Sequence, residues 1–420
     1  MRKLGIVALG AVAALALAGC AGGDAGTPPA ADSGKITVWV VGGDTPDTAR
    51  AYLKDTFEAE NKGWTLTVEE KTWADVSDTY AAALQSNDAP DVVEIGNTQT
   101  ASFADQGLIA SVEDQRDALG ADDFLSGLEE SATYEGELFA APYYAGGRVV
   151  FYSQQILGST PVPTTLDEYV ASGVATATDT RSGIWAPGRD WYNALPYVWA
   201  HGGFIAEQEG DEWKAGFSSE GGVAGLTQLQ EVYTKASRAA KDGDEQAPQV
   251  PFCAGETVFL SAPAWIQSSI EAPLDAENPG CPDTFGSDLN VFPLPGLKAG
   301  ETAPIFAGGS NMAVATKSAS PEKARAALAV LTSPGYQQLL AEGGLTPGIV
   351  SAAKFLPDTP VAQAQAKALE NSKVTPVTPK WAEVEAAQII QEALVKIAQG
   401  GDVKSIASDL DAAIEKILNS

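Results

Sequence analysis

Five side chains between positions 185 and 193 bring together the two kinds of chemical group that hold a sugar ring. Trp185 and Trp191 are aromatic, and Arg189, Asp190 and Asn193 are planar and polar. A sugar ring offers apolar C–H faces on which an aromatic ring stacks, and a rim of hydroxyls that pair with carboxylate, amide or guanidinium groups. The stretch is the densest such cluster in the chain. We expect at least two of its members to contact a ligand, with Asp190 and Trp191 favoured.

Further candidates follow predicted strands, and a parallel sheet binds ligands at the carboxyl ends of its strands. Asp44 comes after the first strand, Trp73 after the second, and Asn97, Thr98 and Gln99 after the third. These residue types suit hydroxyl groups or sugar faces. A purely structural role is the alternative for three of these residues. Trp73 would instead pack against the next helix, and Asn97 or Thr98 would instead cap a helix.

The N-terminus predicts export and lipid attachment. Arg2 and Lys3 precede an unbroken run of apolar residues and glycine over 4–17, and Leu17-Ala18-Gly19-Cys20 closes the run with small residues. A charged start, a short apolar core and a small-residue cleavage site are typical of an export signal. The apolar run is too short for a typical membrane-spanning helix. The closing motif resembles the bacterial lipobox. We therefore expect residues 1–19 to be removed, Cys20 to carry lipid and residues 20–34 to form a flexible tether. The alternative is an ordinary secreted protein with a coincidental cysteine.

Cys253 and Cys281 are the other two cysteines, an even pair in a chain expected in an oxidising compartment. We predict one disulfide between them, with a contribution to stability of roughly 2–4 kcal/mol. Two buried thiols are the alternative.

Strands and helices alternate after the tether. Strands are predicted at 35–41, 64–70 and 92–95, with helices that start near Thr45-Pro46 and at Asp75 between them. This order predicts a parallel α/β sheet. The later predictions are strands at 138–144, 148–152, 258–260 and 289–294, and helices at 223–240, from Ser320, from Ser333, over 384–397 and over 406–417.

Composition and missing motifs exclude several classes of function. The net charge is -29 and no stretch supplies a basic patch, so we expect neither nucleic acid nor an anionic lipid surface as a partner. His201 is the one histidine, and neither a Gly-x-Ser-x-Gly elbow nor a phosphate-binding Gly-x-x-x-x-Gly-Lys loop occurs. We predict no cofactor and no metal. A glycosidase with paired carboxylates remains the rival to a binding protein, and a surface adhesin or scaffold is a third class.

The chain after the tether resembles the extracellular solute-binding proteins of ABC-type sugar importers, the class related to maltose-binding protein. The order of its motifs carries this resemblance. The motifs are Pro90-Asp91-Val92-Val93-Glu94, Phe103 with Gly107-Leu108-Ile109, Pro142-Tyr143-Tyr144, Gly255-Glu256, Ser261-Ala262-Pro263-Ala264-Trp265, Gly308-Gly309-Ser310-Asn311, and Gly343-Gly344-Leu345-Thr346-Pro347. The stretches 93–98, 142–152 and 251–253 are similar to the branch that imports N,N′-diacetylchitobiose and related N-acetylglucosamine sugars.

The resemblance implies a two-lobed, periplasmic-binding-protein-like α/β fold of type II. Each lobe would be a mainly parallel sheet flanked by helices, with lobes at 35–145 plus 308–352 and at 146–307 plus 353–420. Hinge crossings are expected near 145–147, near 307–309 and within 345–354, where glycine pairs at the first two tolerate rotation. The implied function is capture of an oligosaccharide by lobe closure and delivery to membrane permease subunits. A monomer, lipid-anchored at the outer face of the cell membrane, would do this.

The same mapping adds site candidates. Trp265 sits just after a strand, in the family position that often stacks on sugar. Ser310 and Asn311 follow the glycine pair of a crossing and are expected to face the cleft. Trp381 starts a helix and is either a cleft wall or a structural staple. Tyr143, Tyr144 and Arg148 flank the first crossing.

Overall fold

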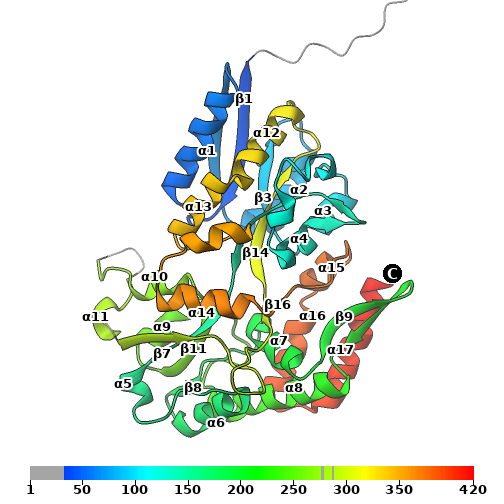
Figure 1. Ribbon diagram of the computed structural model, residues 1–420. Coiled ribbons are helices and arrows are strands. Elements are labelled where there is room, and N and C mark those ends of the chain that lie inside the picture. Colours follow the sequence, from blue (N-terminus) through cyan, green and yellow to red (C-terminus); the bar gives the residue numbers. More distant parts are fainter. Residues whose placement is uncertain (1–32, 276–278, 286–287) are drawn as a thin grey trace, which may run out of the picture.

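Two sheets, each with its own apolar core, organise the chain into an upper and a lower body (Figure 1). The computed structural model describes residues 33–275, 279–285 and 288–420. Cys20 and the predicted export signal lie outside the described residues. The apolar core of the upper body draws on residues within 36–144 and 312–355, and that of the lower body on residues within 150–306 and 381–418. Each body is therefore discontinuous in sequence.

Six strands in the order β15-β6-β14-β3-β1-β2 form the upper sheet. The first three strands of the chain run parallel to one another, as the alternating pattern predicts, whereas β14 is antiparallel to both of its neighbours. Their bounds are β1 Gly34–Val41, β2 Trp64–Lys71, β3 Val92–Gly96, β6 Ala141–Gly146, β14 Gly308–Val314 and β15 Thr346–Pro347, and a small hairpin joins β4 Thr133–Tyr134 to β5 Glu137–Leu138.

Helices cover both faces of this sheet because each presents an apolar stripe to it. In α1 (Asp47–Glu60) the buried residues are Ala49, Leu53 and Phe57, the predicted apolar face. The helix α2 begins at Trp73, two residues before the predicted start at Asp75. The other helical segments are α3 Thr100–Asp105, η1 Glu113–Gln115, η2 Ala121–Asp123, α4 Ser126–Ala132, α12 Pro321–Thr332, α13 Pro334–Glu342 and η5 Val350–Phe355.

The lower sheet has four strands in the order β12-β7-β11-β8. Two of its three pairings are antiparallel, as are three of the five in the upper sheet, so the sheets are mixed rather than mainly parallel as expected. The strands of the lower sheet are β7 Arg148–Ser153, β8 Ser182–Ile184, β11 Thr257–Pro263 and β12 Leu289–Phe292, and two further pairs are β9 Phe204–Glu209 with β10 Glu212–Gly216 and β13 Ile305–Phe306 with β16 Ser372–Lys373.

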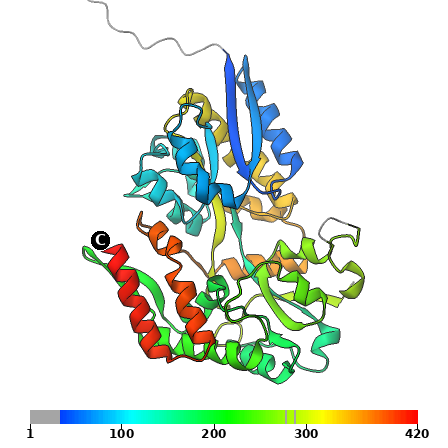
Figure 2. The ribbon, with the colours of Figure 1, turned by 180° about the vertical axis from the view of Figure 1, so that it is seen from behind.

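Figure 2 shows α16 and α17 on the outer flank of this body, where they pack together. The helical segments are α5 Gln154–Leu157, α6 Leu166–Thr176, α7 Trp191–Ala200, α8 Glu220–Glu231, η3 Val232–Ala236, α9 Gln249–Cys253, α10 Ile266–Ile270, α11 Pro282–Phe285, α14 Pro360–Leu369, α15 Trp381–Ala386, α16 Ile389–Ala398 and α17 Val403–Leu418.

The predicted helix over 384–397 is wrong in one respect, because it is broken into α15 and α16. Gln388 has a left-handed backbone, with φ of 50°, which a continuous α-helix does not allow. The break lets α15 leave the line of α16, so that Trp381 is fully buried with its ring 6.1 Å from that of Trp191. The predicted helix over 223–240 likewise ends earlier, in the π-turn Val232–Ala236.

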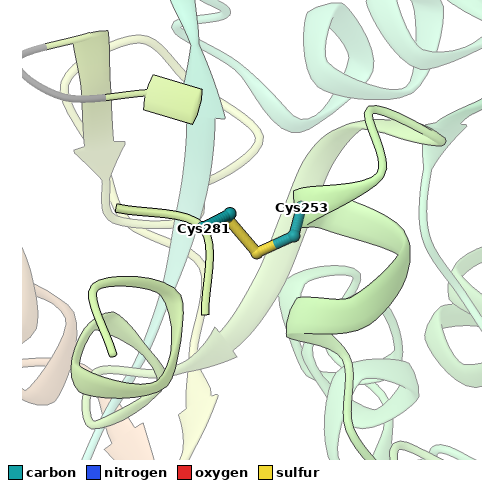
Figure 3. Close-up of a disulfide and its surroundings, with 2 residues drawn as sticks. All are labelled: Cys253 and Cys281. Atoms are coloured by element: carbon teal, nitrogen blue, oxygen red, sulfur yellow. A yellow bond between two sulfur atoms is a disulfide. The ribbon is translucent and has the colours of Figure 1, made fainter. Parts of the chain in front are cut away.

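The predicted disulfide between Cys253 and Cys281 is confirmed (Figure 3). It ties the last residue of α9 to the residue before α11. Cys281 is buried in a small apolar cluster with Phe252 and Phe285, whose rings lie 4.7 Å apart. The loop that the disulfide closes contains β11 and α10, the segment on which Trp265 lies.

Two of the chain crossings between the bodies run side by side, from β6 to β7 and from β13 to β14. Gly309 at the second crossing has φ of 135°, and an added Cβ there would lie 2.3 Å from the Tyr144 carbonyl oxygen. The close approach of β6 and β14 therefore requires glycine at this position. Within the residues that the structure describes, no helix combines the length and apolarity needed to cross a membrane.

Candidate functional site

A cleft of about 520 Å³ lies between the two bodies. This volume falls within the roughly 300–1,000 Å³ of small-molecule sites. The upper body contributes Asp44, Trp73, Asn97, Thr98, Gln99 and Tyr144, and the lower body contributes Arg148, Trp191, Tyr192, Glu245, Trp265 and Glu385, among others.

Two partly exposed tryptophans from opposite bodies line this cleft. Trp73 is the first residue of α2 and is 43% exposed, and Trp265 at the N-terminus of α10 is 53% exposed. Large apolar side chains with this exposure in a concave site are typical of a ligand platform. The cleft can therefore offer one stacking surface from each body.

A pair of carboxyl groups lies at the upper wall of the cleft. Asp44 lines the cleft and bonds to the Tyr144 hydroxyl, and its partial burial raises its pKa. Glu94 lies behind it, wholly buried, where it accepts hydrogen bonds from the Val41 amide at 2.7 Å and the Ser310 hydroxyl at 2.6 Å. Burial is the main reason that the pKa of Glu94 rises to about 7, and the nearby Asp44 charge adds to it. Asp44 thus offers hydrogen-bond acceptors to a sugar hydroxyl or N–H.

An ion pair forms part of the lower wall. The Arg148 guanidinium holds both Glu245 carboxylate oxygens, at 2.6 and 2.9 Å, and its central carbon lies 5.0 Å from the centre of the Tyr192 ring. Burial alone lowers the pKa of Arg148, but the charges of Glu245 and Asp190 raise it above its ordinary value. The pair fixes a polar edge beside an aromatic face.

Asp190 acts as a helix cap beneath this wall. Its carboxylate accepts from the Asn193 backbone amide at 3.1 Å and from the Asn193 side chain at 2.6 Å. Burial, followed by the Glu245 charge, raises the pKa of Asp190 to about 6. Asp190 and Trp185 line a separate cavity of about 20 Å³ rather than the cleft.

The structure brings seven of the predicted ligand-binding residues to the cleft and leaves five elsewhere. Those in the cleft are Asp44, Trp73, Asn97, Tyr144, Arg148, Trp191 and Trp265. Those elsewhere are Trp185, Asp190, Ser310, Asn311 and Trp381. The side chains of Asn97 and Thr98 do not cap α3: they bond to the Ala307 carbonyl and to Glu385.

The expectation that Ser310 and Asn311 face the cleft is wrong, because both are fully buried. They lie on β14, whose two edges pair with β6 and β3, and every residue from 310 to 314 is buried. The Ser310 side chain donates to Glu94, and the Asn311 side chain donates to Thr100 and Ser131. Trp381 is also fully buried, and its indole N–H donates to Glu385 at 2.9 Å, as expected of a structural staple.

Sequence reasoning missed several cleft-lining residues. Tyr192 adjoins the predicted cluster, and its aromatic type was a usable signal. Glu245 lies in a polar loop, and Glu385, Gln365 and Gln391 lie on helices far along the chain. No local pattern distinguishes these four from solvent-facing residues.

Comparisons with known proteins agree with this geometry. The chain matches the family of bacterial extracellular solute-binding proteins over residues 52–391. It is 32% identical over 398 residues to the diacetylchitobiose binding protein DasA of Streptomyces coelicolor, with 91% of each chain covered. It is 22% identical to a galactooligosaccharide-binding protein of Bacillus subtilis, over 77% of this chain and 75% of that one.

Solved structures with a similar fold include sugar-binding proteins. The GacH receptor of Streptomyces glaucescens has a TM-score of 0.76 at 21% identity, covering 92% of this chain and 99% of that one. A cyclo/maltodextrin-binding protein complexed with maltotetraose has a TM-score of 0.76 at 19% identity, covering 94% and 98%. At these identities the likeness concerns the fold, and the predicted type II fold class is confirmed.

Proposed function

The chain belongs to the bacterial extracellular solute-binding proteins, and from that premise we propose that it captures diacetylchitobiose or another short oligosaccharide containing N-acetylglucosamine and delivers it to an importer's permease. The names of its relatives describe the binding of sugars rather than catalysis, and the chain shares their family of solute-binding proteins. The glycosidase alternative is therefore set aside.

The single observation that carries the proposal is the composition of the cleft. Trp73 and Trp265 line the cleft from opposite bodies and are partly exposed, and Asp44 and the Arg148–Glu245 pair add polar groups to the same lining. Two rings of a disaccharide need two faces, and their hydroxyl and acetamido groups need hydrogen-bond partners. The name of the Streptomyces coelicolor relative supports the same sugar.

Capture by lobe closure follows from the arrangement of the bodies. We place the lobes at 35–145 plus 308–352 and at 146–307 plus 353–420, with hinges at the crossings between them. Because the cleft takes residues from both lobes, a bound ligand stabilises the arrangement in which they approach one another. The closed protein, as a monomer, would then present one surface to the permease.

The lipid anchor is a separate part of the proposal. Cys20 in Leu17-Ala18-Gly19-Cys20 would become the acylated N-terminus, with residues 20–34 as the tether. A Cys20→Ser variant should appear in the culture medium, whereas the unaltered chain should stay with the membrane fraction. Equal partition of both variants would contradict the anchor.

Calorimetric titration tests the ligand. The chain without its export signal, with Cys20→Ser, would be titrated with chitobiose, N-acetylglucosamine, maltose, trehalose and cellobiose, and each mixture would be checked for cleaved product. We expect chitobiose to bind with micromolar or tighter affinity, about -8 kcal/mol or better, and to be recovered intact. Tight binding of a different sugar would correct the ligand, and cleavage would contradict the binding function.

Tryptophan variants connect that affinity to the cleft. Trp265→Ala and Trp73→Ala should each cost about 2 kcal/mol of binding free energy, as anchors of a binding site do. Trp213→Ala is the matched control, because Trp213 lies on the β9–β10 hairpin, outside the cleft lining. A loss of affinity as large in the control would show that the effect is not local to the cleft.

A further inference from the structure

One hydrogen bond joins side chains of the two bodies across the cleft wall. The Thr98 hydroxyl donates to Glu385 Oε2 at 3.3 Å. Thr98 lies in the loop between β3 and α3 of the upper body, and Glu385 lies on α15 of the lower body. Figure 1 shows α15 at the top of the lower body, above α16. The contact therefore lies where the bodies approach one another.

The Thr98 end of this contact is held in place by its neighbour. The Asn97 side chain donates to the Ala307 carbonyl at 2.7 Å, and the Asn97 amide donates to the Gly309 carbonyl at 3.2 Å. Both acceptors belong to the crossing between β13 and β14. The loop that carries Thr98 is thus fixed to the hinge strand.

The Glu385 end is held equally firmly. Its other carboxylate oxygen, Oε1, accepts the Trp381 indole N–H at 2.9 Å, and Trp381 is fully buried. Burial raises the pKa of Glu385, and the hydrogen bonds from Trp381 and Thr98 oppose that effect. A partly buried carboxyl group is costly unless its oxygens have partners, and the two donors supply one partner to each oxygen.

Aromatic packing connects Glu385 to the cleft wall and to the crossing. The Trp381 ring lies 6.1 Å from that of Trp191, which lines the cleft and lies 5.7 Å from the Phe306 ring. Phe306 directly precedes the crossing at Ala307. Thr98 and Glu385 themselves also line the cleft.

We propose that Glu385 is a positioning residue that links the two lobes across the cleft, through Thr98, and so stabilises the closed arrangement around a ligand. The inference rests on the proposed function only in that the cleft holds a ligand, whatever its identity. Thr98 and Glu385 lie on different lobes, so any hinge rotation that lengthens the distance between them breaks their hydrogen bond. Their hydrogen bond thus favours the closed state and slows release of the ligand.

A double-mutant cycle isolates this contact from direct contacts to the sugar. Thr98→Val removes the hydroxyl and keeps the shape, Glu385→Ala removes the acceptor, and the double variant removes both. Glu383→Ala is the matched control, since Glu383 lies on the same helix, is 58% exposed and pairs with Lys380. Glu385→Gln is the conservative variant, because an amide can still bond to Thr98 and Trp381.

Release of chitobiose is measured by stopped-flow tryptophan fluorescence, and the radius of gyration of the unliganded chain by X-ray scattering. Each single variant should release the sugar about tenfold faster, the worth of one charge-assisted hydrogen bond, and the double variant no faster than the quicker single one. Glu383→Ala should match the unaltered chain and Glu385→Gln should fall between. The radius of gyration should increase in both single variants.

Additive losses in the double variant would overturn the proposal, because they would mean that the two residues act separately. An unchanged release rate in Glu385→Ala, or an equal effect of Glu383→Ala, would overturn it too. If the unaltered chain binds no sugar at all, the proposed function fails. The scattering measurement still decides this proposal in that case: an increase in Thr98→Val and Glu385→Ala alone supports it, and no increase overturns it.

Discussion

Removal of the disulfide between Cys253 and Cys281 should lower the stability of the lower body by an amount that its loop length sets. The two cysteines are 28 residues apart, and the chain-entropy relation for a loop of that size gives about 3.6 kcal/mol at 25 °C. The double variant Cys253→Ala/Cys281→Ala avoids a leftover thiol. If a lower body of roughly 220 residues melts as one unit, its unfolding entropy of about 0.46 kcal/mol/K converts this loss to about 8 °C in Tm.

Differential scanning calorimetry of the oxidised chain, the reduced chain and the double variant provides the measurement. The reduced chain and the double variant should melt at similar temperatures, both below the oxidised chain. A fall of about 4 °C instead would indicate that both bodies unfold together, because the unfolding entropy is then nearly doubled. An unchanged Tm would refute the reasoning, since the bridge would then not restrict the unfolded chain.

Other perturbations test the buried charges. The pKa of Glu94 is raised from 4.5 to about 7, so the folded state holds a proton that the unfolded state loses, and stability should fall as pH rises through this window. Between pH 4.5 and 7 the unaltered chain should lose about 3 kcal/mol more unfolding free energy than the Glu94→Gln variant does. Urea titration at each pH measures this loss. If the unfolding free energies of the two proteins change in parallel with pH, the prediction is contradicted. Glu245→Ala leaves Arg148 without its bidentate partner and should lower the free energy of unfolding by about 3 kcal/mol. Urea titration measures this change as well. An unchanged free energy of unfolding would show that Asp190 alone suffices to balance the charge of Arg148.

Much of the fold was predictable because local patterns decide it. Runs of β-branched residues predict the first three strands, and apolar residues at every fourth position predict α1. The structure has these strands and this helix. The break at Gln388 was not predictable, since apolar periodicity continues across it. It follows from the burial of Trp381, which depends on Trp191, a residue distant in sequence.

The cleft-lining residues that follow the end of a strand were predictable. Those whose position depends on tertiary packing were not. Trp73 and Asn97 reach the cleft because the ends of parallel strands meet at one edge of the sheet. Ser310 and Asn311 do not, because their strand enters the middle of the sheet from the other body, where residues 310–314 are all buried. Glu245 and Glu385 come to the cleft through helices and loops whose placement no local pattern records.

The central position of β14 in the upper sheet has a consequence for how the chain folds during synthesis. β14 lies between β6 and β3 yet ends at Val314, so about three-quarters of the chain must be made before β3 and β6 can be joined through it. Pairings between such distant segments form slowly. The joining of the upper sheet is therefore a late step of synthesis, and until β14 is made, β3 and β6 lack the strand that lies between them.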